Sequence, residues 1–243
     1  MKYNYLKFIS VLVIGVSVAT GCKEGTEDPI AFGYEYFPTD SGRYVQFKVD
    51  SIAWNDFTIP STVDTFRFDI REINDSVFTD IAGEDATVLI RNRRDSANGA
   101  WYIKDVWSMK RTNARAEKVE ENERIVKLTF PIVDGAVWNG NLYNTNDPWE
   151  YELTKIGEPF TVNGFTFNET VTVLQTGNND IPSGQTEPLL NKQLGKEVYA
   201  KGVGLVYKEL TILEANIVPG TPFDQRIKRG FKMFMVLTDY SPQ

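Results

Sequence analysis

The chain has 243 residues and a formal net charge of -7, with no histidine and one cysteine. Without histidine there is no Ser-His-Asp or Cys-His catalysis and no metal site with a His ligand, and one cysteine excludes an intrachain disulfide and a Cys zinc site. The acidic balance, with no basic patch, argues against a nucleic-acid partner, and no motif nominates a catalytic residue, a metal site or a cofactor.

The first 21 residues have the pattern of a secretory signal peptide. Lys2 and Lys7 give the chain a positively charged start. The apolar stretch LKFISVLVIGVSVA begins at Leu6 and is too short for a transmembrane helix. The stretch leads into VATGC, which resembles a bacterial lipobox with Val18 and Thr20 at positions where Leu and Ala or Ser are commoner. The resemblance implies cleavage before Cys22 and acylation of that residue, which would attach the protein stably to a membrane. The alternative is an ordinary signal peptide with an incidental cysteine.

Residues 22–32 are predicted to form a flexible tether. The segment KEGTEDP is polar and contains Gly25 and Pro29. A lysine and acids directly after Cys22 also resemble the surface-export signal of Bacteroidetes lipoproteins, although Gly25 interrupts the acidic run. We therefore expect a lipid-anchored protein of the outer membrane or cell surface, with the periplasmic face as the alternative.

Residues 33–243 are predicted to form a single antiparallel β domain. Six segments alternate apolar and polar side chains with a period of two, as strands with one buried face do. They are residues 44–52, 65–70, 101–109, 124–130, 165–173 and 231–237. We expect a mainly β fold, an antiparallel twisted sheet with an open half-barrel or sandwich-like shape and one or two short helices.

Three connecting segments carry more specific signals. The Asn-Gly pair at 163–164 predicts a hairpin with a type I′ turn. Residues 113–124 contain helix formers with poor apolar spacing, and we favour a hairpin that turns at 121–122 over a helix. Residues 187–197 have Pro188 in their first turn and leucines at helical spacing, which predicts a short helix packed on the sheet.

An internal similarity suggests a subdivision of the domain. YFPTDSGRYVQF at 36–47 resembles TFPIVDGAVWNG at 129–140. The similarity suggests two related β units, 33–128 and 129–243, and the alternative is two unrelated turns that each enter a strand. No linker marks a boundary between them, so one folded domain is the simpler expectation.

The lipobox, the tether and the segments YFPTDSGRY, LTFPIVDGAVWNGN and VYAKGVGLVYKE together resemble a family of uncharacterised Bacteroidetes lipoproteins. YAKGVGLVYKE is also similar to a late strand pair of periplasmic β proteins of open, half-barrel shape, a group that includes lipoprotein carriers. That similarity concerns the fold and implies no function. Gly202 and Gly204 are expected at a bulge or a tight bend.

One stretch, VWNGNLYNTNDPWEYE, combines aromatic rings with Asn and Asp. Flat rings and amides in loops suit carbohydrate or peptide recognition. The candidate ligand-binding residues are therefore Trp138, Tyr143, Trp149 and Tyr151. The alternative is that rings such as Trp138 fill the core.

Three Asp-Ser pairs followed by a small or apolar residue match the loose O-glycosylation pattern of exported Bacteroidetes proteins. They make Ser51, Ser76 and Ser96 candidate modification sites, although Asp-Ser is also common turn chemistry. Asp105 is an acid on the apolar face of its predicted strand, which indicates either a strand edge or bulge, or a buried site with a partner.

These observations support three functions. The first is a lipid-anchored binding or structural module of the cell envelope, with a glycan or peptide as the ligand. The second is a hydrolase that acts on glycans through paired carboxylates. The third is a carrier of lipid or lipoprotein with an apolar concave face, which an apolar cavity in the structure would favour.

Overall fold

The computed structural model describes residues 32–58, 61–179 and 181–241, and regular structure there is twelve β-strands and two single-turn 3-10 helices. The strands are β1 (Tyr44–Asn55), β2 (Thr62–Thr79), β3 (Asp85–Arg94), β4 (Tyr102–Arg111), β5 (Arg115–Glu120), β6 (Glu123–Thr129), β7 (Val137–Asn139), β8 (Glu150–Val162), β9 (Phe165–Thr176), β10 (Asn191–Ala200), β11 (Gly204–Ala215) and β12 (Ile227–Tyr240). The helices are η1 (Tyr34–Tyr36) and η2 (Phe223–Gln225). The predicted signal peptide and Cys22 lie outside the described residues. No helix within these described ranges is long and apolar enough to cross a membrane.

All twelve strands belong to one antiparallel sheet, which confirms the predicted fold class. The strand order is β6-β5-β4-β3-β2-β1-β12-β11-β10-β9-β8-β7. Consecutive strands therefore pair throughout, except that β1 pairs with β12 and that β6 and β7 form the two edges. The proposed units 33–128 and 129–243 correspond to the two halves of this sheet, and their relatedness stays a prediction.

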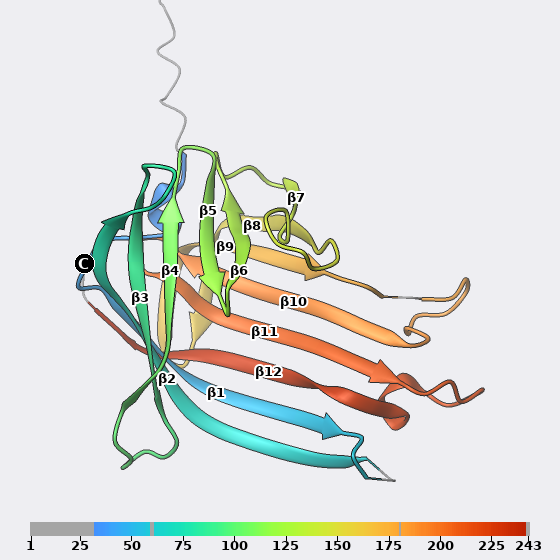
Figure 1. Cartoon of the computed structure of the whole chain (residues 1–243). Helices are drawn as coiled ribbons and strands as arrows, with labels where there is room; N and C mark the ends of the chain where they lie inside the picture. The colour runs from blue at the N-terminus through green and yellow to red at the C-terminus, as the bar shows by residue number, and fades with distance from the viewer. Residues whose placement is uncertain (1–31, 59–60, 180, 242–243) are drawn as a thin grey trace, which may run out of the picture. The chain divides into compact units, whose positions relative to one another are not determined.

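The sheet coils until its two edges meet at one end (Figure 1). The backbone N–H of Val126 in β6 donates to the carbonyl of Gly140, just after β7, at 2.9 Å. The indole Nε1 of Trp138 donates to the carbonyl of Val126 at 2.9 Å. At the other end β1, β2 and β10–β12 extend well beyond this seam, so the coil opens into a flared sheet (Figure 1).

Two hairpin turns have the predicted geometry. The turn at 163–164 has φ of 47° at Asn163 and 84° at Gly164, and the turn at 121–122 has φ of 50° at Glu121 and 66° at Asn122. Positive φ at both central residues defines a type I′ turn, whose twist matches that of the paired strands. The hairpin predicted for 113–124 is therefore confirmed as β5 and β6.

The helix predicted for residues 187–197 is wrong, because most of this segment belongs to strand β10. Both β9 and β11 pair with β10, so its backbone groups are satisfied by the sheet on two sides. A short segment has only a marginal helix preference, which such pairing outweighs. Gly195 favours the strand further, since the side chain of Gln175 lies where a Cβ would be. The two 3-10 turns lie elsewhere in the chain, and the described residues contain no α-helix.

Hydrophobic clusters lie on both faces of the sheet. One fills the closed end of the coil and includes Phe37, Leu89, Leu128, Leu153, Val173 and Tyr199. A second lies on both faces of β1 and β10–β12, with Val49 and Met235 on the inner face and Tyr207 with the tip of the β8–β9 hairpin on the outer face. Irregular pairing between Thr154 and Phe160 bends β8 outward, and the ring of Phe160 then lies 5.8 Å from that of Tyr207. The hairpin tip thus covers the outer face, and the inner face of the flared part has no such cover among the described residues.

Candidate functional site

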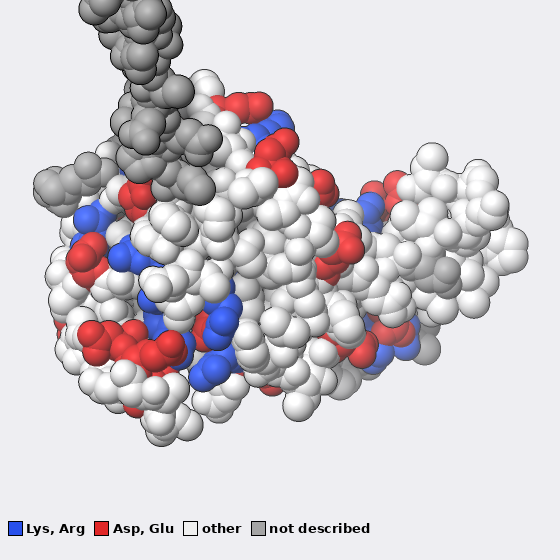
Figure 2. Space-filling view, turned by 90° about the horizontal axis from the view of Figure 1, so that it is seen from above, with Lys and Arg blue, Asp and Glu red and all other residues white. Residues whose placement is uncertain are grey.

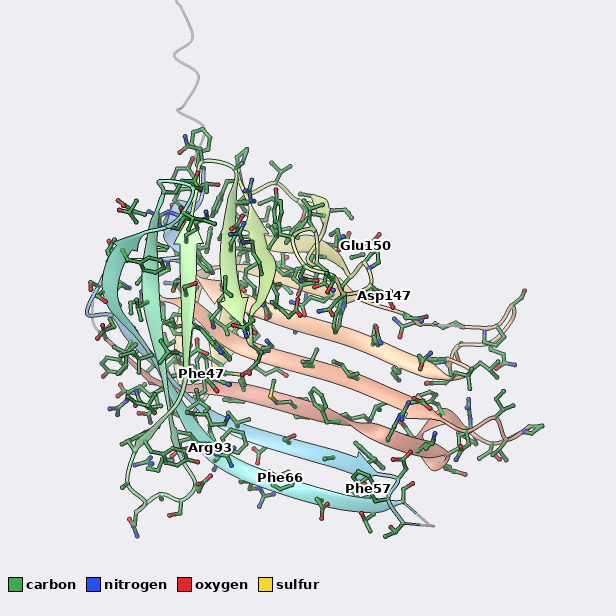
Figure 3. All side chains as sticks on the ribbon, in the orientation of Figure 1. Phe47, Phe57, Phe66, Arg93, Asp147 and Glu150 are labelled. Carbon is green, nitrogen blue, oxygen red and sulfur yellow. The ribbon has the colours of Figure 1, made fainter. Side chains whose placement is uncertain are left out.

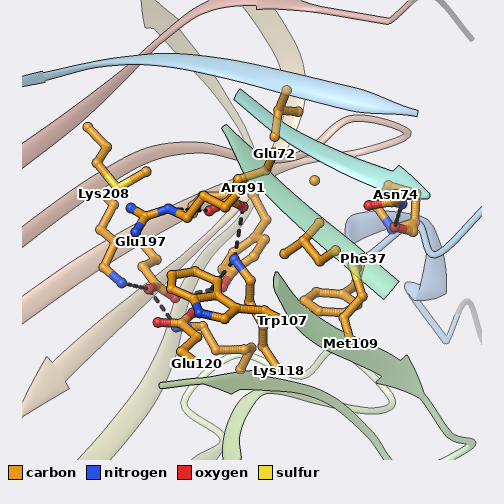
Figure 4. A pocket seen from close by; sticks show the side chains of 18 of the residues that line it. Phe37, Glu72, Asn74, Arg91, Trp107, Met109, Lys118, Glu120, Glu197 and Lys208 are labelled. Carbon is orange, nitrogen blue, oxygen red and sulfur yellow. Dashed lines mark hydrogen bonds and ion pairs between the residues drawn. The ribbon is translucent and has the colours of Figure 1, made fainter. Parts of the chain in front are cut away.

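A cavity of about 270 Å³ lies inside the coiled sheet (Figure 4). The strands of the first half of the sheet form one wall, and β11 and β12 form most of the other. The apolar part of the lining includes Val45, Leu89, Leu205, Leu210, Met233 and Met235. Most of the remaining lining residues are aromatic or charged, so the cavity combines an apolar part with a polar part.

Glu197 is the centre of the polar side. Its side chain is 0% exposed. One carboxylate oxygen accepts a hydrogen bond from Lys127 at 2.7 Å and lies 3.2 Å from the ammonium of Lys208. The other oxygen accepts a hydrogen bond from the hydroxyl of Tyr199 at 2.6 Å. Since Lys127 belongs to β6 and Glu197 to β10, this ion pair spans the interior of the coil.

A second ion pair lies beside the first. Lys118 of β5 donates to the carboxylate of Glu72 in β2 at 2.8 Å, and both side chains are buried. Arg91 of β3 lies 3.5 Å from the same carboxylate. The centroid of the Trp107 ring lies 4.5 Å from the guanidinium carbon of Arg91 and 5.0 Å from the ammonium of Lys118. The two ion pairs together form a charged cluster, and this cluster joins strands from both halves of the sheet.

Asp105 was expected either at a strand edge or bulge, or at a buried site with a partner, and the structure shows a bulge and a partner together. The pairing of β3 with β4 shifts between Arg91 and Asn92, next to Asp105. Its carboxylate also accepts hydrogen bonds from Arg91 and from Lys104, both at 3.3 Å. The acid therefore lies at a bulge and has cationic partners that compensate its charge.

The cluster keeps its acids ionised. Burial alone raises the pKa of Glu197, but the charges of Lys127 and Lys208 outweigh it and lower the pKa to about 2. Glu120 shows the same balance, with burial opposed by Lys208, Lys127 and Lys118, and its pKa is lowered as well. Burial alone lowers the pKa of Lys127, but the charges of Glu197 and Glu120 outweigh it, and the pKa is raised above its usual value. At neutral pH these groups are charged partners, so neither carboxyl carries a proton that it could donate.

An apolar surface continues from the cavity along the inner face of the flared sheet. Met233 pairs with Leu210, and two residues further along the same strands Phe231 pairs with Ile212. Because side chains two apart share a face, both pairs face inward. Phe66 of β2 lies on the same face and is 48% exposed, and Figure 3 shows it on the flared part of the sheet. The cavity therefore opens onto a concave apolar surface.

The four aromatic candidates lie at the seam of the coil. Tyr151 is a core residue, packed against Trp138, whose indole bonds across the seam. Trp149 is partly buried against the same core. Tyr143 is exposed, and the guanidinium carbons of Arg115 and Arg124 lie 4.7 Å and 5.9 Å from the centroid of its ring. None of the four lines the cavity, and their ligand-binding role stays a prediction.

The three candidate glycosylation serines have different surroundings. Ser51 lies within β1, opposite Phe66 and Met233, and is partly buried. Ser76 is exposed at an irregular point of the β2–β3 pairing, and Ser96 is exposed in the β3–β4 turn. Their modification stays a prediction, and accessibility favours Ser76 and Ser96.

The outer surface pairs most of its charges locally. Figure 2 shows Lys and Arg side chains beside Asp and Glu side chains on one part of the molecule, whereas the lobe on the right is largely uncharged. Lys110 illustrates the pairing, since its ammonium donates to Asp80 at 2.7 Å and to Glu84 at 2.6 Å. The hydrogen bond from Lys110 lowers the pKa of Asp80 to about 2. These groups hold the outer strands and turns together.

The charged cluster was not predicted from the sequence. Lys127 alternates with Val126 and Leu128, so the pattern predicts it on the solvent face of its strand and gives no sign of burial. Glu197 gives no sign either, because the helix predicted for 187–197 hid its place on the inner face of a strand.

The chain matches no known protein family, and no curated protein is similar to it. Two crystal structures from Bacteroidetes resemble it in fold. A lipoprotein candidate from Parabacteroides distasonis has a TM-score of 0.41 and 13% sequence identity, covering 88% of this chain and 100% of that one. An exported-protein candidate with a YmcC-like fold from Bacteroides fragilis has a TM-score of 0.42 and 13% identity, covering 87% of this chain and 100% of that one.

Proposed function

We propose that this chain is a lipid-anchored protein of the outer membrane or cell surface that binds a ligand with an apolar body in the cavity and on the concave face beside it. The observation that carries the proposal is a cavity inside the coil that continues along the partly buried side chains of Met233 and Phe231 to the exposed side chain of Phe66. Ligand pockets of proteins are typically apolar with a few polar groups that orient the ligand. Such a protein would serve as a carrier or a receptor.

The chemistry of the cavity supports binding over glycan hydrolysis. Paired-carboxylate hydrolysis requires one carboxyl that is protonated and can donate to the leaving group. Of the four acids that line the cavity, Glu72, Glu120 and Glu197 each have a cationic partner, and the pKa values of Glu120 and Glu197 are lowered. Charged acids in ion pairs suit the recognition of a polar group and lack the proton that this reaction needs.

The binding surface is tested by placing a charge on it. We expect Met233→Asp to weaken binding of the uncharged fluorophore N-phenyl-1-naphthylamine about tenfold, because a carboxylate in an apolar site must be desolvated. The full chain with Cys22→Ala is titrated, so that its own acyl groups do not compete. Lys232→Asp is the matched control, since the neighbouring side chain lies on the other face of β12. A parent protein that does not bind the fluorophore, or equal loss in both variants, contradicts the proposal.

The anchor is tested by metabolic labelling with an alkyne fatty acid. We expect the wild-type chain to incorporate the label and Cys22→Ala to incorporate none, because Cys22 is the one thiol of the chain and the predicted acylation site. Label in the Cys22→Ala variant, or none in the wild type, would contradict acylation at this position.

A further inference from the structure

Arg91 lines the cavity with part of its hydrogen-bonding capacity unused. Its Nη1 donates to Asp105 at 3.3 Å. Its Nε lies 3.5 Å from Glu72, as an ion pair without a hydrogen bond, and is buried with no hydrogen-bond partner among the described residues. Nothing in residues 32–58, 61–179 and 181–241 accepts a hydrogen bond from Nη2. A buried donor without an acceptor is costly, so a ligand that supplies one is stabilised here.

The two unused nitrogens lie on one edge of the guanidinium group. Nε and Nη2 together present two parallel N–H groups, the arrangement that binds a carboxylate with two hydrogen bonds. The Nη1 bond to Asp105 and the contact with Trp107 fix the orientation of the group. Arg91 is therefore held in place for a planar oxyanion, which on binding takes the position of the Glu72 carboxylate beside Nε, while Glu72 keeps its hydrogen bond from Lys118.

The charge of the cavity wall fits an anion of a single charge. Its cations are Arg43, Arg91, Lys118, Lys127 and Lys208. Its acids are Glu72, Glu120, Glu121 and Glu197. Asp105, outside the lining, has a cation of its own in Lys104 at 3.3 Å. The wall thus carries one excess positive charge, which a monoanion would balance and a dianion would overcompensate.

The apolar side of the cavity faces this charged side. Met233, Met235 and Leu210 lie on β11 and β12, opposite the β3 strand that carries Arg91, and Figure 4 shows Arg91 among the charged side chains of the wall. We infer that Arg91 binds the carboxylate of a ligand whose apolar chain lies along Met233 and Met235 toward the concave face. The ligand class is a long-chain monocarboxylate. This inference rests on the proposed function, because it names the head group of the same ligand.

Displacement of N-phenyl-1-naphthylamine from the full chain with Cys22→Ala tests the head group. Dodecanoate, dodecanol and dodecyl phosphate share one apolar chain and differ in charge. We expect dodecanoate to bind about tenfold or more tightly than dodecanol, since a bidentate charge-assisted pair is lost in the alcohol. In Arg91→Gln this preference should disappear while the fluorophore still binds. Arg91→Lys, which keeps the charge without the two-nitrogen edge, should recover only part of it.

Arg93→Gln is the matched control, because Arg93 lies on the same strand but is paired with Asp95 at 2.6 Å and does not line the cavity. Arg91→Gln leaves no acid without a cation, since Glu72 keeps Lys118 and Asp105 keeps Lys104. Equal binding of dodecanol and dodecanoate, tighter binding of dodecyl phosphate, or an unchanged preference in Arg91→Gln would overturn the inference and leave the apolar site intact. Failure of the fluorophore to bind the parent would instead overturn the proposed function.

Discussion

Glu197→Gln is expected to lower the free energy of unfolding by about 3–5 kcal/mol, because removing one partner of a buried ion pair leaves the other charges uncompensated. Lys127 and Lys208 would lose the carboxylate that lies 2.7 Å and 3.2 Å from their ammonium groups. Urea unfolding at neutral pH measures the loss. Glu169→Gln is the control, since its ion pair with Lys201 is exposed and is expected to contribute about 1 kcal/mol or less. Similar stabilities of the two variants would show that the buried pair does not hold the coil together.

The Glu197→Gln variant is also expected to change how the free energy of unfolding depends on pH in the acidic range. The pKa of Glu197 is lowered from its usual 4.5 to about 2 in the folded protein. Its stabilising contribution is therefore complete above the usual value and is lost as the pH falls from 4.5 toward 2. We expect the wild type to lose unfolding free energy over this range and Glu197→Gln to lose less of it. Urea unfolding repeated at decreasing pH would show the two curves converge, and parallel curves would contradict the assigned pKa.

Tyr151→Ala is expected to destabilise the fold by about 3–5 kcal/mol, as truncation of a fully buried aromatic ring does. The side chain is 4% exposed and packs against Trp138, which bonds across the seam. Its ring also covers Gly140, where it occupies the space that a Cβ would need. Thermal and urea unfolding measure the effect, and Tyr151→Phe separates the ring from the hydroxyl.

Tyr143→Ala is the natural comparison, because the ring of Tyr143 is exposed and lies beside the guanidinium groups of Arg115 and Arg124. Exposed cation–π contacts contribute about 1 kcal/mol or less each. We therefore expect a small loss of stability at this position. A glycan array run on the same proteins tests recognition, and binding that Tyr143→Ala abolishes would restore the aromatic stretch as a ligand site. Equal unfolding curves for Tyr151→Ala and the wild type would show that Tyr151 is not a core residue.

The aromatic stretch shows where sequence reasoning lost information. Trp138 and Tyr151 lie in neighbouring strands at the seam, where the edges of the sheet meet. That meeting depends on the coiling of all twelve strands, so no local pattern distinguishes a ring that closes the seam from a ring in a recognition loop. The helix predicted for 187–197 failed for a related reason, since β9 and β11 supply its hydrogen bonds from outside the segment.

Features that depend on a few neighbouring residues could be predicted from the sequence. Alternation of apolar and polar side chains predicts strands, and residues that tolerate positive φ predict the turns at 121–122 and 163–164, because both are properties of a few adjacent residues. The strand order, the seam and the charged cavity depend on the coiling of the whole sheet and could not be predicted in this way. Lys127 and Glu197 are 70 residues apart in the chain and meet only because β6 and β10 face each other across the coil. Such a pairing leaves no periodic signal in the sequence, since each residue occupies one inward position on its own strand.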